Sequence, residues 1–230
     1  MASSFLIVSS LLVASMMGAI FWKFCPSVPD KIYGITGVLF FLVIPGILSA
    51  TGLLSDFSDF PPALFKLLLT LFILTLIAVL TPWGERLVRN TPISILICAQ
   101  TFRFLPEIFL VLAYREGTAP IQMTLHGKNL DIITAVISLV LFLRWKKIRQ
   151  HLQLAMFHTA VGLLLLLNVV ATAILSMPSP IRIYDNSPST AFIGTFPNTW
   201  LPSVHVVAAL LLHGLAIRKI IQQRKMLNIK

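Results

Sequence analysis

Seven stretches of this 230-residue sequence are apolar, almost free of charged residues and about as long as a membrane helix. A bilayer core about 30 Å thick is crossed by a helix of about 20 residues, which bonds every backbone amide within itself. We therefore expect an all-α, polytopic transmembrane helix bundle with seven spans. The predicted spans are residues 5–22, 33–54, 67–83, 92–114, 130–143, 156–177 and 200–217.

The spans leave little of the chain for anything else. Hydrophobic residues make up 57% of the sequence and charged residues 11%, whereas a soluble globular domain carries about 25% charged residues. Seven spans of about 20 residues use about 140 positions, so the remaining segments are too short for a second, water-soluble domain. We expect residues 1–230 to form a single transmembrane domain, with any function inside the bundle or on its short loops.

Basic residues collect on the segments that would share one side of the membrane. The net charge of +10 would suggest nucleic acid as the partner of a soluble protein, but in a membrane protein a basic excess marks the cytoplasmic side. With the N-terminus outside, most of the 18 lysines and arginines lie on inner segments, against Asp30 and Glu85. We predict an N-out, C-in, multi-pass protein of the inner (plasma) membrane, with the lipid bilayer and no nucleic acid as its partner. The inner basic residues are Lys23, Lys31, Arg86, Arg89, Arg144, Lys146, Lys147, Arg149, Arg218, Lys219, Arg224, Lys225 and Lys230.

The fourth predicted span carries the polar side chains that a membrane interior tolerates least. At 100° per residue, its polar residues Gln100, Arg103, Glu107 and Tyr114 fall on one face, which should point into the bundle. Arg103 and Glu107 are four residues apart and are expected to pair. Pro106 cannot donate a backbone hydrogen bond, so we expect a kink and a free carbonyl beside Arg103.

Two interpretations of this pair stay open. In the structural interpretation, the ion pair locks the bundle. In the functional interpretation, the pair forms the floor of an outward-opening cavity. Arg103 would then bind an anionic or carbonyl-bearing group, while Glu107 would accept a proton or a hydroxyl.

Further polar residues are expected at the level of Glu107. His126, Asn129 and Asp131 precede or open the fifth span, and His205 lies near the outer end of the seventh. Asn129 and Asp131 also suit a second role as caps of a helix N-terminus. The predicted ligand-binding residues are Gln100, Arg103, Glu107, His126, Asn129, Asp131 and His205. No catalytic residue is assigned.

Metal and chromophore sites are not indicated. His126, Asp131 and His205 are residue types that bind zinc, but the sequence lacks a helical His pair at i, i+4, and His205 and His213 are eight apart. The seventh span has no lysine for a retinal Schiff base. We predict no metal and no cofactor, and we assign no role to His158 and His213.

Two motifs carry a resemblance to a known group. F-R-x3-E starts at Phe102, and M-T-x2-G-x-N-x-D-I runs from Met123 to Ile132, with W-L-P later at Trp200. These motifs resemble an element of an uncharacterised bacterial seven-helix integral membrane protein family. The resemblance implies that the fourth span and its connection to the fifth act as one unit, and it implies no activity.

Three functions remain open. The leading hypothesis is a membrane protein that binds a small polar or amphiphilic molecule, or a lipid, from the outer side, with transport or sensing of that molecule left open. The alternative is an integral membrane enzyme acting on a lipid or isoprenoid substrate, with Glu107 and either His126 or His205 as acid and base. A structural or assembly role is third. The oligomeric state is left open.

Overall fold

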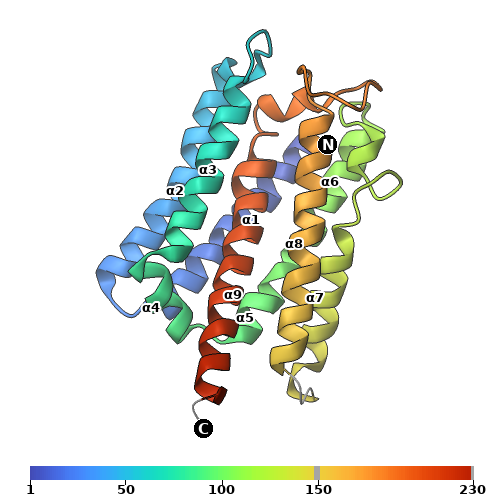
Figure 1. Ribbon diagram of the computed structural model, residues 1–230. Coiled ribbons are helices and arrows are strands. Elements are labelled where there is room, and N and C mark those ends of the chain that lie inside the picture. The colour runs from blue at the N-terminus through green and yellow to red at the C-terminus, as the bar shows by residue number, and fades with distance from the viewer. Residues whose placement is uncertain (148–150, 229–230) are drawn as a thin grey trace.

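The structure, a computed structural model, describes residues 1–147 and 151–228 and contains helices and no strands over these residues (Figure 1). The α-helices are α1 (Ala2–Phe24), α2 (Val28–Ala50), α3 (Ala63–Leu80), α4 (Pro82–Asn90), α5 (Ile93–Cys98), α6 (Phe104–Arg115), α7 (Ile132–Arg144), α8 (His151–Leu175) and α9 (Val207–Asn228). Short 3-10 turns are η1 (Leu53–Ser55), η2 (Ala99–Arg103), η3 (Ile121–Met123), η4 (Trp145–Lys147) and η5 (Thr190–Gly194). A π-helical segment, η6 (Leu201–Val206), leads into α9.

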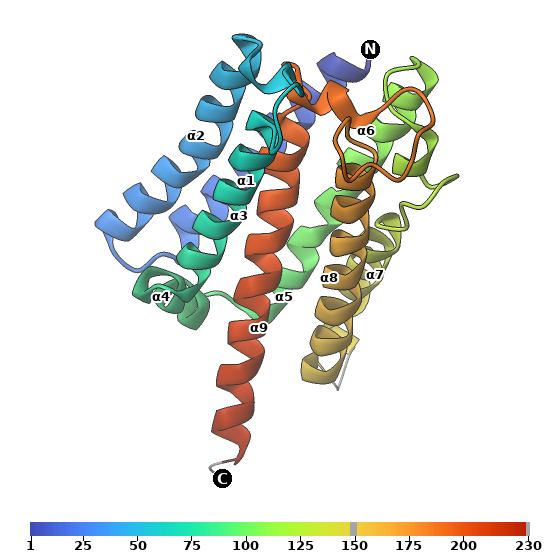
Figure 2. The same cartoon turned by 45° about the horizontal axis from the view of Figure 1, so that its top comes forward.

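Six helical segments are long and apolar enough to cross a membrane. They are α1, α2, α3, α8, the continuous segment Ile93–Arg115 and the segment Leu201–Met226. The all-helical fold expected from the sequence is therefore confirmed over the described residues, and its six long apolar helices suit a membrane. Helix α7 is apolar but has only 13 residues, so its crossing, and with it the count of seven, stays a prediction. The two chain ends lie at opposite ends of the bundle (Figures 1 and 2).

One connection differs from the prediction. The charged segment after α3, expected as an inner connection, forms the short helix α4. Pro82 stands in its first turn, where a missing N–H costs nothing. Its apolar side, with Trp83 and Leu87, is buried, while Glu85 and Arg89 form an ion pair on the other side. The alternation of apolar and charged residues is that of a helix lying against the bundle.

The connections of the bundle divide into two sets. The α1–α2 turn, α4, the end of α7, the start of α8 and the last turns of α9 lie at the end of the bundle that holds the C-terminus (Figure 1). The segments between α2 and α3, between α6 and α7, and between α8 and η6 lie at the other end. The connections predicted to share one side of the membrane therefore share one end of the bundle. Of the predicted inner basic residues, Arg149 and Lys230 fall outside the described residues.

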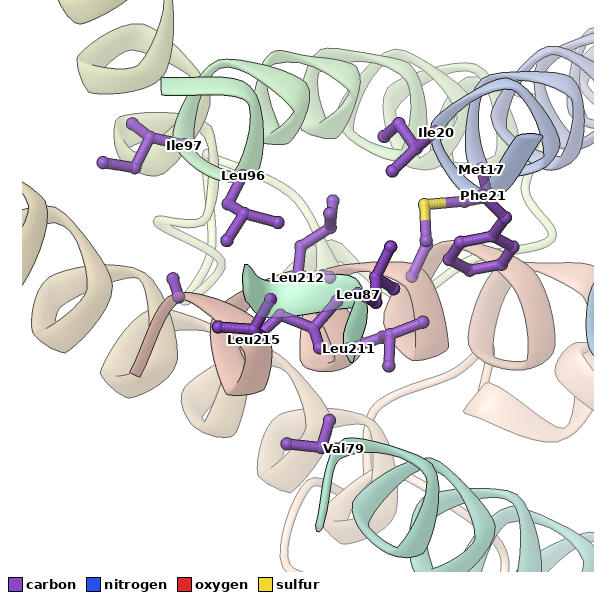
Figure 3. Close-up of a cluster of buried hydrophobic side chains, with 14 of the residues drawn as sticks. Met17, Ile20, Phe21, Val79, Leu87, Leu96, Ile97, Leu211, Leu212 and Leu215 are labelled. Carbon is purple, nitrogen blue, oxygen red and sulfur yellow. The ribbon is translucent and has the colours of Figure 1, made fainter. Parts of the chain in front are cut away.

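Helix α9 is the centre of the bundle and packs on α3, α5 and α8. Figure 3 shows part of its apolar contacts, where Leu211 and Leu212 of α9 lie among Phe21 of α1, Val79 of α3 and Leu96 of α5. Residues 207–216 of α9 are all buried or partly buried. The start of α9 lies against the fourth span, where the Ala209 carbonyl accepts a hydrogen bond from Gln100.

Candidate functional site

The fourth span is helical throughout but changes its winding in the middle. Residues Ala99–Arg103 form the 3-10 turn η2 between α5 and α6. Pro106 lacks the N–H that would bond to the carbonyl four residues earlier, and its ring crowds the preceding turn, so the regular winding is interrupted there. Gln100, Arg103 and Glu107 are all buried, as predicted. Tyr114 is 38% exposed, so it does not share the buried polar face of the span.

Arg103 is paired with Asp131, so the predicted pairing with Glu107 is wrong. Its Nε donates to Asp131 Oδ2 at 2.8 Å, and its Nη2 bonds to Asp131 Oδ1. The planar guanidinium can hold both oxygens of a carboxylate that faces it from another helix. Asp131, at the start of α7, provides that geometry, and the Glu107 carboxylate is engaged by Asn129 instead.

Asn129 ties the segment before α7 to α6. Its Nδ2 donates to Glu107 Oε1 at 2.7 Å and to the Met123 carbonyl at 3.0 Å, and its Oδ1 accepts the amide of Asp131 at 3.0 Å. Asp131 stands at the N-cap of α7, but its side chain makes no capping hydrogen bond. Neither side chain therefore caps the first-turn amides of α7: Asn129 closes a turn on the amide of Asp131, and Asp131 is an ion-pair partner.

The connection between α6 and α7 is shaped to present Asn129. The Thr124 carbonyl accepts the amide of Gly127 at 2.9 Å and that of Asn129 at 3.3 Å, which closes a tight turn. A Cβ atom at Gly127 would lie 2.3 Å from the Ile121 carbonyl oxygen, so only glycine fits this close backbone approach. The glycine and asparagine of the M-T-x2-G-x-N-x-D-I motif thus have structural explanations.

A cavity of about 70 Å³ lies beside these residues, between α6, α8 and η6, and we call it the polar cavity. The volume is enough for a few water molecules. The polar residues that contribute to its lining are Arg103, Glu107, Asp131 and His205, all buried. The partly exposed residues of its lining are apolar: Leu68, Val169, Val170, Ala173, Ile174, Pro202 and Val206. The path into the cavity therefore passes between apolar side chains of membrane-facing helices.

The other predicted site residues have different positions. His205 lies in η6, with Nε2 3.2 Å from Ser10 Oγ and a buried Nδ1 that has no hydrogen-bond partner. Gln100 donates to the Ala209 carbonyl at 3.1 Å and does not contribute to the cavity lining. His126 is exposed on the connection before α7 and does not line the cavity. The structure therefore brings four of the predicted residues to one cavity, with Asn129 behind Glu107.

Two histidines without a predicted role belong to the same buried cluster. His213 Nε2 lies 3.1 Å from Arg103 Nη1, and because arginine can only donate, this nitrogen is the acceptor of a neutral ring. The His213 ring is 5.7 Å from that of His158, whose Nε2 lies 2.7 Å from Ser138 Oγ. Nη1 of Arg103 also donates to the Gly162 carbonyl at 3.2 Å.

A metal centre is not formed by the part of the chain that the structure describes. No three His, Cys, Asp or Glu side chains among those residues lie close enough together to hold an ion. In particular, His126, Asp131 and His205 do not form a common site, since His126 is exposed and the other two line the buried cavity.

Comparison with known proteins identifies a family. The family described as "Domain of unknown function (DUF8737)" matches residues 61–221, which is more than half of the chain. The chain belongs to this family. The matched region contains the whole of the polar cavity and leaves out α1 and α2. No curated protein and no solved structure matches the chain. Membership in an uncharacterised family agrees with the expectation from the motifs, whereas the motif itself as a family element and a bacterial origin stay predictions.

Proposed function

We propose that this protein binds a small amphiphilic molecule whose polar end occupies the polar cavity, at Glu107 and His205, while its apolar remainder lies outside the cavity against α3 and α8. The observation that carries the proposal is the distribution of residues around the cavity. Most of the lining is apolar, the four polar side chains in it are buried, and every partly exposed lining residue is apolar. Such a site matches a molecule with one polar group and an apolar remainder.

Glu107 and His205 are the polar groups left free to meet an occupant. Arg103 and Asp131 neutralise each other, and the guanidinium is further bonded to Gly162 and His213, so this pair is a framework. Over the described residues, none of the ion pairs includes Glu107, whose carboxylate receives one hydrogen bond, from Asn129. A hydroxyl or amine donor on the ligand would satisfy the second carboxylate oxygen and the free nitrogen of His205.

The proposal includes a membrane topology and a route of entry. The single domain crosses the plasma membrane seven times with the N-terminus outside, which follows from the gathering of basic residues at one end and puts the cavity in the outer half. Leu68, Val170 and Ile174 border the route on α3 and α8. A ligand that partitions into the bilayer would enter between them, to be transported or sensed.

The test is to identify what the purified protein carries. Wild-type protein, Glu107→Leu and Ala173→Leu would be purified in detergent and their bound small molecules and lipids profiled by mass spectrometry. Ala173→Leu is designed to fill the cavity and leaves its polar groups unchanged, and Glu85→Gln, on α4 and outside the cavity lining, is the control. We expect one molecule to be present in wild type and control and depleted at least tenfold in both cavity variants. Equal amounts in all four proteins would contradict the proposal.

Catalysis is the second candidate, because Glu107 and His205 line the same cavity and are an acid and a base by residue type. His126, the other residue considered for this role, does not line the cavity. The two functions differ in what a deletion strain accumulates. Accumulation of a lipid or isoprenoid precursor together with loss of its product would favour the enzyme, and unchanged lipid pools would favour binding.

A further inference from the structure

The lining of the polar cavity contains more carboxylates than cations. Its charged residues are Arg103, Glu107 and Asp131, and the guanidinium of Arg103 is matched by the carboxylate of Asp131. The carboxylate left over belongs to Glu107, which is 5% exposed. Its Oε1 receives the hydrogen bond from Asn129 at 2.7 Å, and none of the described residues donates to its Oε2. One carboxylate oxygen of a residue that lines the cavity is therefore without a partner.

The histidines near the cavity do not supply a balancing positive charge. A charged imidazole ring has two N–H groups to satisfy, but the buried Nδ1 of His205 has no hydrogen-bond partner among the described residues. The His205 ring is therefore neutral. The ring of His213 is neutral as well, because its Nε2 accepts from the Arg103 guanidinium.

The other elements around Glu107 bring no charge to it over the part of the chain that the structure describes. Helix α1, which packs on α6, has no charged side chain from Ala2 to Trp22. The lining residues from α3 and α8 are all apolar. An isolated buried carboxylate is costly, so its charge has to be balanced either by a proton or by a cation that enters the cavity.

The size and the entry of the cavity limit which cation fits. The volume of about 70 Å³ has room for a few water molecules. A primary ammonium group is about as large as one water molecule and has three N–H donors, as in lysine, whereas a trimethylammonium group is much larger and has none. An inorganic ion would have to shed its water to pass the apolar entry. A primary ammonium on an apolar chain meets both conditions.

We propose that the polar cavity selects a primary ammonium head group, which takes the place of a proton on Glu107. This inference rests on the proposed function and names the class of ligand, an amphiphilic primary amine. In the empty cavity the Glu107 carboxyl holds a proton. When the ammonium binds, that proton leaves, and the Glu107 carboxylate and the ammonium form an ion pair beside the unchanged pair of Arg103 and Asp131. The buried cluster is neutral in both states.

The test compares four ligands that share a dodecyl chain and differ in the head group. The full chain, purified in a neutral detergent at pH 7, would be titrated with dodecylammonium, dodecyltrimethylammonium, dodecanol or dodecanoate, and bound ligand measured by equilibrium dialysis. Affinities are expressed per mole fraction of ligand in the micelles, so that differences in partitioning cancel. We expect dodecylammonium to bind at least about tenfold more tightly than each of the others, because it alone can form an ion-paired hydrogen bond with Glu107.

Glu107→Gln removes the charge and keeps an acceptor for the hydrogen bond from Asn129. This variant should bind dodecylammonium at least about tenfold more weakly than wild type, while its affinity for dodecanol should be unchanged. Glu116→Gln is the matched control and should keep the wild-type preference. Glu116 stands at the end of the same helix, is exposed and does not line the cavity.

The exchange with a proton can be tested on the wild-type protein alone. Because one proton leaves for each ammonium bound, the affinity for dodecylammonium should rise about tenfold from pH 6 to pH 7. The ligand itself stays charged over this range, as a lysine side chain does. In Glu107→Gln the affinity should be the same at both pH values.

The possible results separate this proposal from the proposed function. Equal affinities of wild type for dodecylammonium and dodecanol, with both ligands lost in Ala173→Leu, would overturn the ammonium selection and leave the proposed function standing. Equal affinities for the primary and the quaternary ammonium, or a dodecylammonium affinity that does not change with pH, would also overturn the selection as proposed. If wild type bound none of the four ligands better than Ala173→Leu does, the proposed function would fail and this proposal with it.

Discussion

Arg103 and Asp131 form a buried, two-pronged ion pair between residues 28 positions apart in the sequence, joining η2 to the start of α7. Through its remaining nitrogen the same guanidinium reaches α8 at the Gly162 carbonyl and α9 at His213. One side chain therefore connects four segments of the bundle. The polar cavity lies directly beside this connection, so its shape depends on the pair, even though we propose that Glu107 and His205 are the groups that meet a ligand.

Removal of one member of the pair should cost far more than removal of both. Arg103→Met leaves Asp131 as an uncompensated buried carboxylate, and Asp131→Leu leaves Arg103 as an uncompensated cation, so we expect each to lower the free energy of unfolding by about 3 to 5 kcal/mol. The double variant replaces the pair with apolar side chains and should be close to wild type in stability. Unfolding in detergent, followed by circular dichroism, measures all three.

Glu107→Gln is the matched control for the pair. The Gln carbonyl oxygen can still accept the hydrogen bond from Asn129, so the stability should change by less than about 1 kcal/mol. The assignment of Arg103 and Asp131 as the framework would be wrong if Glu107→Gln were as damaging as Asp131→Leu.

Local sequence signals were enough for the helices but not for the contacts between them. The spans follow from uncharged apolar runs, because a membrane helix must satisfy its backbone internally and face lipid with apolar side chains. The burial of Gln100, Arg103 and Glu107 follows from helical phase and the cost of charge in a membrane. These inferences need only one helix at a time.

The ion-pair partner of Arg103 could not be predicted from the sequence of one helix. Spacing along the sequence favours Arg103 with Glu107, whereas the guanidinium selects the carboxylate that faces it across the bundle, Asp131. His213 was missed for the same reason, since its contact with Arg103 depends on how α9 packs against η2. The amphipathic pattern of Pro82–Asn90 was a detectable signal for α4, with apolar residues on one side and Glu85 and Arg89 on the other.

Cys25 should be an unreactive thiol. It is 4% exposed in the turn between α1 and α2, and burial together with the nearby negative charge of Asp30 raises its pKa from 9.0 to about 11. The reacting species is the thiolate, whose fraction at pH 8 is then about 100-fold lower than in an ordinary thiol. In a Cys98→Ala variant, maleimide labelling of Cys25 at pH 8 should therefore be at least about 100-fold slower than labelling of an exposed cysteine.

The pH dependence of the labelling rate distinguishes a raised pKa of Cys25 from steric blockage of its thiol. As the pH rises toward 11 the thiolate fraction grows, so the Cys25 labelling rate should increase about tenfold per pH unit between pH 8 and 10. The labelling rate of an exposed cysteine with an ordinary pKa should level off above pH 9, as its thiolate fraction approaches one. Labelling of Cys25 at the exposed rate at pH 8 would contradict the burial of this turn.

The membrane orientation can be tested with two introduced cysteines in a background without Cys25 and Cys98. Ser187 is exposed on the connection between α8 and η6, and Asn90 is exposed at the end of α4. With the N-terminus outside, a membrane-impermeant maleimide added to intact cells should label Ser187→Cys at once and Asn90→Cys only after permeabilisation. The reverse pattern would show that the N-out assignment is wrong, and labelling of both in intact cells would show that the two ends of the bundle do not lie on opposite sides of the membrane.

Gly162 should tolerate no side chain, because α8 approaches α9 and α7 closely at this residue. A Cβ atom there would lie 2.4 Å from His213 Cε1 and 2.9 Å from Thr134 Cγ2. Since His213 is held by Arg103, the ring cannot move away without breaking a buried hydrogen bond. Overpacking of this kind costs about 1 to 3 kcal/mol, so Gly162→Ala should lower the free energy of unfolding by that amount.

Gly18→Ala is the matched control, since Gly18 is also helical but has open space for a side chain. At this position the better helix propensity of alanine should stabilise the protein by up to about 1 kcal/mol. Equal stability changes at the two glycines, measured by unfolding in the same detergent, would show that the contact between Gly162 and His213 does not exist in the folded protein.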